Sequence, residues 1–450
     1  MANKLRSNAR FFAVRDLTRI EKESSYSNKV VDQTVARGQL SKLDANLHTT
    51  LVYGTIQNKI TLDFFLQPFL KKTNKLDLWV KQILRISVYQ MVYLSRIPKH
   101  AIFNESIEIA KEMGHNGTRK FVTGVLHAIE RQGLPKFDEI EDQVKRFSIE
   151  YSMPVWLVQQ LISELGSQKT ESLLAATLQA PAQSVRLNTT LSDPSDVQNI
   201  LKHEGYQVKP SVVTPLAFRI AGGFPPSSQA YSDGKITVQD ESAVLSAESM
   251  QIQDTDKVLD VCAAPGGKTT QIAQALGNDG HVDALDIHPK KLKLIQKNVL
   301  RMHLNDRVST HALDARKCGQ VFGPASFDKI LVDAPCSGLG LIRRKPEVKY
   351  DKSAEDSKKL AHVQLAILNA AAPLVKKGGS LTYSTCTILN QENQQVIDNF
   401  LEENANFYQV KTWTSYGLKD DRETLSLTIY PDDFDSDGFF IATLFKKNEV

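Results

Sequence analysis

The chain has 450 residues, 41% of them hydrophobic and 24% charged, with a formal net charge of +4, and this length predicts two or three soluble domains. No apolar run approaches the roughly 18–20 residues of a membrane span, and no apolar signal-peptide core follows Met1–Arg6. The four cysteines, at positions 262, 318, 336 and 386, form neither a disulfide scaffold nor a C-x-x-C metal pair. We therefore expect free thiols, no bound metal, no membrane and a reducing cytoplasm.

The first 136 residues are predicted to form a basic, helical domain. They hold 22 Lys and Arg against 11 Asp and Glu, whereas the remainder holds 33 against 40. A basic domain favours a nucleic-acid partner, although a solvated basic face remains the alternative. Leu84, Val88, Met91 and Val92 follow the spacing of an amphipathic helix, and Gly133-Leu134-Pro135 indicates a break. The predicted domain is 1–136.

Residues 137–237 are predicted to hold linker helices followed by a small α+β RNA-binding module. Helical stretches are predicted over 140–180, interrupted at Pro154 and ended at Pro181. Short strands are then predicted at 184–188, 206–208 and 217–220, around a helix near 194–204.

The C-terminal part, 238–450, shows strand–helix alternation, which predicts a doubly wound α/β domain. The predicted strands are 257–261, 281–286, 308–312, 328–333, 378–383 and 438–446, and helices are predicted at 268–276, 289–302 and 355–375. Ligands in such sheets bind at the carboxyl ends of the strands, near the topological switch point. The motifs below all lie at those ends.

A glycine-rich loop follows the first of these strands. Gly266 and Gly267 permit a tight turn before a helix whose free N–H groups can face a ligand. The loop is not a P-loop, because Cys262 stands where that motif needs glycine. Asp286 ends the next strand, where an acid can bind ribose hydroxyls, and Asp314 comes after the third strand, where it could contact an adenine amino group. Each alone is more typical of a helix cap, but together with the glycine loop the series predicts a nucleoside cofactor site.

Two cysteines follow later strands, Cys336 in Asp333-Ala334-Pro335-Cys336 and Cys386 in Ser384-Thr385-Cys386. Either alone could be a buried packing residue. Together they match the needs of cytosine C5 methylation, in which a thiolate adds to the neighbouring ring carbon and a base later removes the C5 proton. Asp333 would protonate or hydrogen-bond N3. The thiols of Cys262 and Cys318 are interpreted as structural.

A basic loop, Arg343-Arg344-Lys345-Pro346-Glu347-Val348-Lys349, follows Cys336. Its position favours contacts with RNA phosphates, with a solvated loop as the alternative.

Residues 184–450 resemble the NOL1/NOP2/Sun family of RNA 5-methylcytosine methyltransferases. The matching segments are 260–268, Asp286, Asp314, 333–338, 384–387 and 437–440. The resemblance implies a Rossmann-like domain, S-adenosyl-L-methionine as cofactor, Cys386 as nucleophile and Cys336 as an aid to product release. It also implies a third catalytic residue, Asp333. The implied cofactor-binding residues are Cys262, Ala263, Ala264, Pro265, Gly266, Gly267, Lys268, Asp286, Asp314 and Asp333.

Residues 1–136 resemble the NusB-type RNA-binding domains. The matches include Leu84-Arg85-Ile86 and Phe121-Val122, although Thr123 and His127 stand where that family usually has Asn and Arg. The combination resembles the bacterial Sun branch of the family, which implies a monomer acting on a cytosine of 16S ribosomal RNA, with Arg186 and Asn188 facing RNA. The same chemistry on tRNA, or a non-catalytic RNA-binding factor, are the alternatives.

Overall fold

The computed structural model describes residues 8–23, 25–70 and 76–448, so Met1–Arg6 lies outside the described part. The chain divides into two compact units. The first, called the N-terminal unit, comprises Met1–Leu178 and Ile342–Asp351, and the second, called the C-terminal unit, comprises Gln179–Leu341 and Lys352–Val450. The domain boundaries proposed after residues 136 and 237 stay predictions.

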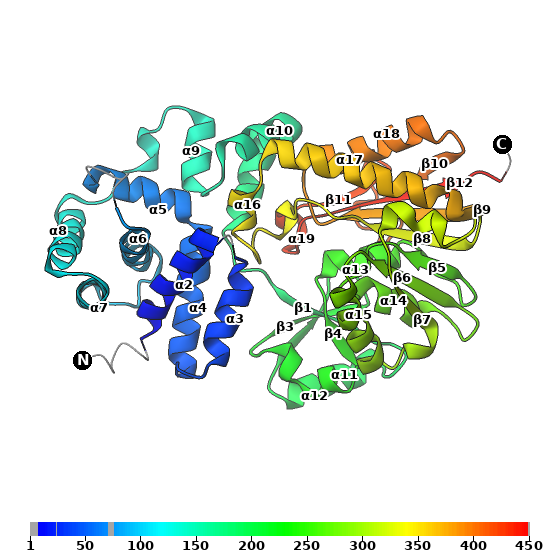
Figure 1. Cartoon of the computed structure of the whole chain (residues 1–450), viewed down its shortest axis with the longest axis horizontal. Helices are drawn as coiled ribbons and strands as arrows, with labels where there is room; N and C mark the ends of the chain where they lie inside the picture. Colours follow the sequence, from blue (N-terminus) through cyan, green and yellow to red (C-terminus); the bar gives the residue numbers. More distant parts are fainter. Residues whose placement is uncertain (1–7, 24, 71–75, 449–450) are drawn as a thin grey trace. The chain divides into compact units, whose positions relative to one another are not determined.

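The N-terminal unit is helical, as predicted, and its described residues contain no strand (Figure 1). Its α-helices are α2 (Ala9–Glu23), α3 (Ser27–Ala36), α4 (Lys42–Gln57), α5 (Lys59–Leu66), α6 (Leu78–Tyr93), α7 (Lys99–Met113), α8 (Asn116–Gln132), α9 (Gln143–Glu150), α10 (Val155–Thr177) and α16 (Val348–Asp351). The break predicted at Gly133 is confirmed, because this glycine ends α8 with a left-handed φ of 77°.

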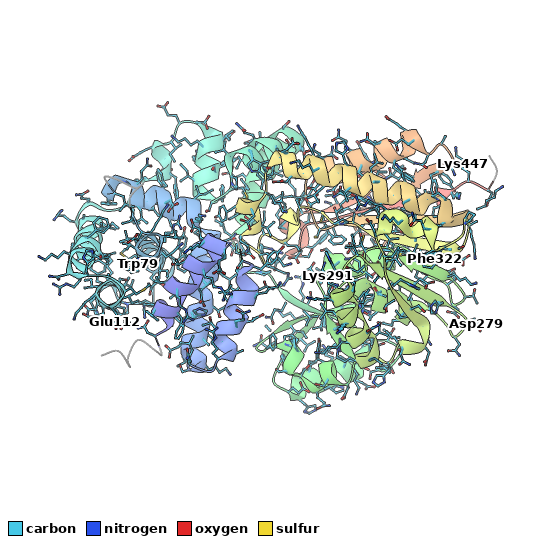
Figure 2. All side chains as sticks on the ribbon, viewed as in Figure 1. Trp79, Glu112, Asp279, Lys291, Phe322 and Lys447 are labelled. Atoms are coloured by element: carbon cyan, nitrogen blue, oxygen red, sulfur yellow. The ribbon has the colours of Figure 1, made fainter. Side chains whose placement is uncertain are left out.

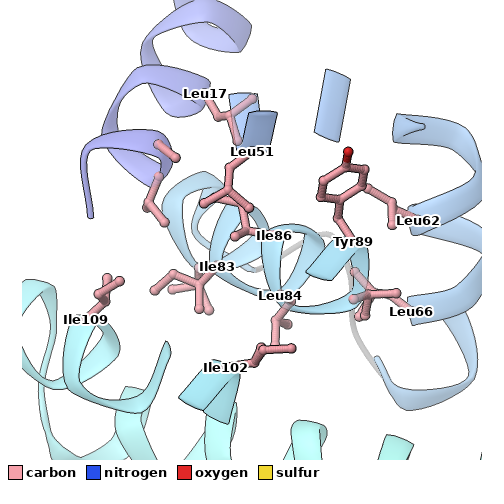
Figure 3. Packing of buried hydrophobic residues seen from close by; sticks show 14 of the residues in the cluster. Leu17, Leu51, Leu62, Leu66, Ile83, Leu84, Ile86, Tyr89, Ile102 and Ile109 are labelled. Carbon is pink, nitrogen blue, oxygen red and sulfur yellow. The ribbon is translucent and has the colours of Figure 1, made fainter. Parts of the chain in front are cut away.

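Helix α6 forms the centre of the N-terminal core. Its Leu84 is fully buried, and Figure 3 shows it beside Ile102 of α7 and beneath Ile86. Val88 is also fully buried, as the helical spacing predicts, and Met91 is half-buried. The prediction is wrong for Val92, which is 40% exposed. The reason is that α6 is buried on nearly every side up to Gln90 and its last turn then extends out of the core.

A buried arginine stabilises this core through paired charges. Arg85 of α6 is 1% exposed and donates two 2.7 Å hydrogen bonds to Asp63 of α5. It also donates a 2.6 Å hydrogen bond to Glu21 of α2. Burial alone would raise the pKa of Glu21, but Arg85 and Lys59 lower it to about 2. Three helices are thus joined through one guanidinium group whose charge is compensated.

The segment 342–351, called the strap, belongs to the N-terminal unit although it lies far along the sequence. Glu347 is buried and accepts hydrogen bonds from the backbone N–H and the hydroxyl of Ser27, at 3.1 and 2.8 Å. Lys349 is fully buried and donates to the Gln57 carbonyl at 2.8 Å. The expected phosphate contacts are therefore wrong for Arg343 and Lys349, since both side chains are buried.

The small α+β module opens the C-terminal unit. Its antiparallel sheet has the order β2-β3-β1-β4. Its elements are β1 (Gln183–Leu187), α11 (Pro194–His203), β2 (Gln207–Pro210), β3 (Ala217–Ala221), α12 (Gln229–Ser232) and β4 (Ile236–Val238), the last of which was not predicted. The expectation that Arg186 and Asn188 face RNA is wrong, because both are fully buried. Arg186 donates to Gln239 and Thr270, and Asn188 donates to the carbonyls of Gly234 and Met302.

The rest of the C-terminal unit is a wound sheet with the order β10-β12-β9-β8-β5-β6-β7, in which β11 pairs with β12. Its strands are β5 (Lys257–Asp260), β6 (His281–Asp286), β7 (Val308–Ala312), β8 (Phe327–Asp333), β9 (Val375–Thr385), β10 (Phe407–Val410), β11 (Leu427–Ile429) and β12 (Phe439–Lys446). The neighbours from β9 to β7 are parallel, whereas β10, β11 and β12 pair antiparallel. The strand order reverses beside β5, which makes its carboxyl end the topological switch point.

Helices cover both faces of this sheet (Figure 1). The α-helices of this part are α13 (Glu241–Glu248), α14 (Gly267–Ala275), α15 (Pro289–Arg301), α17 (Ala354–Ala371), α18 (Gln394–Glu403) and α19 (Pro431–Phe434). Because side chains alternate along a strand, Val258 of β5 packs with α14 and α15, whereas Leu259 packs with α17 and α18. The two apolar layers hold the strand ends in fixed positions.

Among the described residues, none of the helices is long and apolar enough to span a bilayer.

Candidate active site at the carboxyl ends of the strands

A cavity of about 460 Å³ lies at the carboxyl ends of β5, β6, β8 and β9. Its lining includes Cys262, Ala264, Asp286, Lys291, Asp314, Asp333, Cys336 and Cys386. Lys291, on α15, is labelled in Figure 2. The fold therefore brings both predicted thiols and all three predicted acids to one space, although they are spread over 101 positions of the chain, from 286 to 386.

The glycine-rich loop forms one wall of this cavity through Cys262 and Ala264. Gly266 has a left-handed φ of 103°, and a Cβ atom there would lie 3.1 Å from the Ile295 backbone, so glycine is required. Helix α14 begins at the next residue. Buried Arg186 donates to the Gly267 carbonyl at 3.2 Å and so ties the small module to the loop.

The remaining loop residues support the wall without lining the cavity. The Ala263 side chain is buried, its N–H donating to the Leu285 carbonyl at 2.8 Å, and Pro265 is exposed. Of the two remaining cysteines, Cys262 lines the cavity. Burial and the surrounding acids raise the pKa of the Cys262 thiol well above its usual range, so it stays neutral. Cys318 is fully buried and its thiol contacts the Ala370 carbonyl, which agrees with its structural interpretation.

Both sequence-predicted cofactor acids lie at the cavity, and both also make local contacts. Asp286 accepts a 2.8 Å hydrogen bond from the His288 backbone. Asp314 accepts from the backbone and the side chain of Arg316, and these hydrogen bonds lower the pKa of Asp314. The helix-cap alternative thus holds for Asp314, whose orientation is fixed by the same contacts.

Asp333 is held at the end of β8 by two partners. Lys268 Nζ donates to Asp333 Oδ2 at 2.8 Å, and Ser384 Oγ donates to Oδ1 at 2.9 Å. Burial alone would lower the pKa of Lys268, but Asp333 raises it above its usual value. Lys268 therefore carries a proton beside Asp333, a contact that the cofactor interpretation of this lysine did not anticipate.

The two predicted thiols lie next to one another. Cys336 Sγ and Cys386 Sγ are 3.3 Å apart, within hydrogen-bond distance. This contact and burial raise the pKa of Cys336 well above its usual range. Cys336 therefore favours the protonated thiol.

Two further residues of the site were not identified from the sequence. Glu392 and Asn393 are buried behind the thiols and hydrogen-bond to the loops that carry them. The only local signal is a polar run, Asn390-Gln391-Glu392-Asn393, directly after an apolar pair and close to Cys386. Such a run ordinarily indicates a solvated turn.

Comparisons with known proteins place all three parts of the chain in known families. Residues 247–445 match the family described as 16S rRNA methyltransferase RsmB/F, residues 7–131 match the NusB family, and residues 153–226 match the ferredoxin-like domain of RsmF/B-like methyltransferases. A Bacillus subtilis protein named probable ribosomal RNA small subunit methyltransferase B is 41% identical over 98% of this chain and 99% of its own length. The chain belongs to the RsmB/F family of 16S rRNA methyltransferases.

Two further similar proteins match over most of their length. The ribosomal RNA small subunit methyltransferase B of Serratia proteamaculans is 32% identical over 90% of this chain and 92% of its own. A solved structure described as that of PH0851 superposes with a TM-score of 0.82 and 25% identity, covering 97% of this chain and 98% of that one. The predicted NusB-like domain, small module and methyltransferase fold are confirmed, as is S-adenosyl-L-methionine as the methyl donor.

Proposed function

We propose that the protein methylates C5 of a cytosine in 16S ribosomal RNA through a covalent bond between Cys386 and C6 of the base. The observation that carries this proposal is the pair of thiols 3.3 Å apart at the ends of neighbouring strands, in the cavity that also holds Asp286 and Asp314. Methylation of an oxygen or of an exocyclic amine needs no such pair, whereas C5 methylation needs one group to attack and one to assist the later elimination.

The cavity suits the methyl donor. Carboxylates at the ends of two neighbouring strands fit the hydroxyl and amino groups of a nucleoside, and the Gly266 turn lets the backbone approach it closely. We infer that the 262–268 loop, Asp286 and Asp314 hold S-adenosylmethionine, with Asp333 at the methyl end. Bound there, it supplies an electron-poor methyl group on a sulfonium.

The reaction follows from the positions of the protein groups. Cys386 adds as a thiolate to C6, and the Lys268–Asp333 pair provides a proton and a hydrogen bond next to N3. The electron density gained by C5 then forms the new bond to the methyl carbon, as the bond from that carbon to sulfur breaks. Loss of the C5 proton and cleavage of the Cys386–C6 bond restore the aromatic ring, assisted by Cys336. The base must be unstacked to reach the thiols.

The proposal is tested by mapping 5-methylcytosine in 16S ribosomal RNA from cells with and without this gene, and by incubating purified protein with 16S ribosomal RNA or tRNA. The expected result is one cytosine in 16S ribosomal RNA that loses its methyl group and regains it on complementation. Methylation of tRNA alone, or of a ribosomal base at a position other than C5, would overturn the proposal.

A further inference from the structure

The two loops that carry the thiols are bonded directly to one another. The hydroxyls of Ser337 and Thr387, each next to a cysteine, are 2.8 Å apart. The Gly340 N–H donates to the Cys386 carbonyl at 2.9 Å. A Cβ atom on Gly340 would lie only 2.0 Å from the Gly438 carbonyl oxygen, so only glycine permits this approach. The positions of the two sulfur atoms therefore depend on one another through the backbone.

Glu392 holds the loop of Cys336. Its side chain is fully buried, and Oε2 accepts from the Ser337 N–H at 2.8 Å and from Gln364 at 3.1 Å. Oε1 accepts from Ser357 at 2.9 Å. Gln364 in turn donates to the Pro335 carbonyl at 3.0 Å. The carboxylate is thus bonded to the residue after Cys336 and, through Gln364, to the residue before it.

Asn393 holds the loop of Cys386 in the same manner. Its Oδ1 accepts from the Thr385 hydroxyl at 2.5 Å, and its Nδ2 donates to the Thr387 carbonyl at 3.1 Å. These are the residues directly before and after Cys386. The Tyr383 hydroxyl, on the same strand as Thr385, donates to the Glu392 carbonyl at 2.6 Å and fixes the backbone that joins the two side chains.

We propose that Glu392 and Asn393 are positioning residues with separate tasks, Glu392 placing Cys336 for the release step and Asn393 placing Cys386 for attack. The inference rests on the proposed function, because it assigns one task to each thiol. The side chain of each residue holds the segment around only one cysteine. Because Glu392 and Asn393 are adjacent in sequence, the pair also sets the spacing of the two loops. A carboxylate suits the first task, since it accepts from three donors that no neutral side chain of this size can satisfy together.

The experiment compares two single substitutions in the full-length protein. Glu392→Gln keeps the size of the side chain but places an amide N–H₂ against donors. We expect it to form the Cys386–RNA bond and methylate the base, and then to accumulate a covalent protein–RNA adduct that survives denaturing electrophoresis only when S-adenosylmethionine is present. Asn393→Ala should instead slow attack, on the order of 10²-fold for a misplaced reacting group.

Attack is measured separately with RNA that contains 5-fluorocytosine, since the fluorine cannot leave as a proton and the adduct is trapped. Glu392→Gln should trap this RNA at nearly the wild-type rate, and Asn393→Ala should not. Glu402→Gln makes the same chemical change at an exposed position on α18 and should behave as wild type in both assays. A purely structural role for the pair would lower both rates in parallel in both variants.

The outcomes separate this inference from the proposed function. If the wild-type protein neither traps fluorinated RNA nor forms 5-methylcytosine, the proposed function fails. If it does both, but Glu392→Gln accumulates no adduct or loses trapping together with methylation, only the positioning inference is overturned. Should Glu392→Gln fail to fold, Ser357→Ala removes one of its three donors and should accumulate a smaller amount of the same adduct. Wild-type behaviour of Ser357→Ala in that case would overturn the inference.

Discussion

Cys336 Sγ lies 3.3 Å from Cys386 Sγ, so the two thiols face the same part of one cavity. Burial and this contact favour the protonated form of Cys336, and we propose Cys386 as the nucleophile. This asymmetry distinguishes two thiols that would otherwise be equivalent in position.

The first prediction follows from this asymmetry. Cys386→Ala should form no covalent RNA adduct, whereas Cys336→Ala should attack and methylate the base and then stall before elimination, accumulating an adduct. Denaturing electrophoresis of labelled RNA with each variant makes the measurement. An adduct with Cys386→Ala and none with Cys336→Ala would show that Cys336 is the nucleophile.

The second prediction concerns the cofactor. Asp286→Ala should weaken S-adenosylmethionine binding, because each charge-assisted hydrogen bond to a ribose hydroxyl contributes roughly 1.5–3 kcal/mol. Isothermal titration calorimetry measures the change. Asp279→Ala, which removes the same charge from an exposed position in the turn before β6 (Figure 2), serves as the matched control and should leave the affinity unchanged. Equal affinity of Asp286→Ala and Asp279→Ala would exclude Asp286 from the site.

The third prediction is a pH dependence of the N-terminal unit. Burial lowers the pKa of Lys349 from its ordinary value of 10.5 to about 7. Between these values the unfolded chain binds a proton that the folded protein does not, so the free energy of unfolding should rise with pH, by at most about 1.4 kcal/mol per pH unit from this group. Below pH 7 the contribution no longer changes.

Urea unfolding of wild type and Lys349→Met at pH 7 and pH 9 measures this effect. A Trp413→Phe background confines the tryptophan signal to the N-terminal unit, which holds the other two tryptophans, Trp79 and Trp156. The wild type should gain stability over Lys349→Met as the pH rises. A difference that is the same at both pH values would contradict the prediction.

The fourth prediction concerns RNA binding by the N-terminal unit. Lys120 and Arg131 are exposed on α8. If both contact phosphates, replacing them with glutamine should reduce the slope of log affinity against log salt by roughly 1.4–1.8, since each neutralised phosphate contributes about 0.7–0.9. Filter binding of 16S ribosomal RNA at several salt concentrations measures the slope. Glu112→Gln on α7 (Figure 2) removes a charge of opposite sign and should not reduce it.

The parallel strands were predictable from sequence because each is an apolar run bounded by turn residues, as in Lys329–Val332. Strands β10 and β11 were not, since Phe407–Val410 and Leu427–Ile429 are too short and too mixed to be distinguished from a loop. Their pairing partner β12 lies elsewhere in the sequence, and only the assembled sheet makes them strands.

The candidate site residues that lie in a characteristic motif were predictable from the sequence. The buried charged residues that hold the surrounding loops in place were not. Asp333 ends a recognisable strand, Cys336 and Cys386 come shortly after such strands, and all three line one cavity. Glu392, Arg186 and Lys349 are charged residues, which local sequence assigns to solvent. Each is buried because its partners come from distant positions, such as Ser337 for Glu392 and Gln57 for Lys349. No local pattern encodes such pairing.

The strap has a consequence for how the protein is made. Ser27 and Gln57 are synthesised early, but Glu347 and Lys349, which bond to them, emerge from the ribosome roughly 170 residues after α10 is complete. At about 5–20 residues per second this is a delay on the order of 10–35 s. The helical unit at the start of the chain therefore stays incomplete until this late segment has been synthesised. A translation product that ends before Asp351 lacks a part of its first unit as well as of its last.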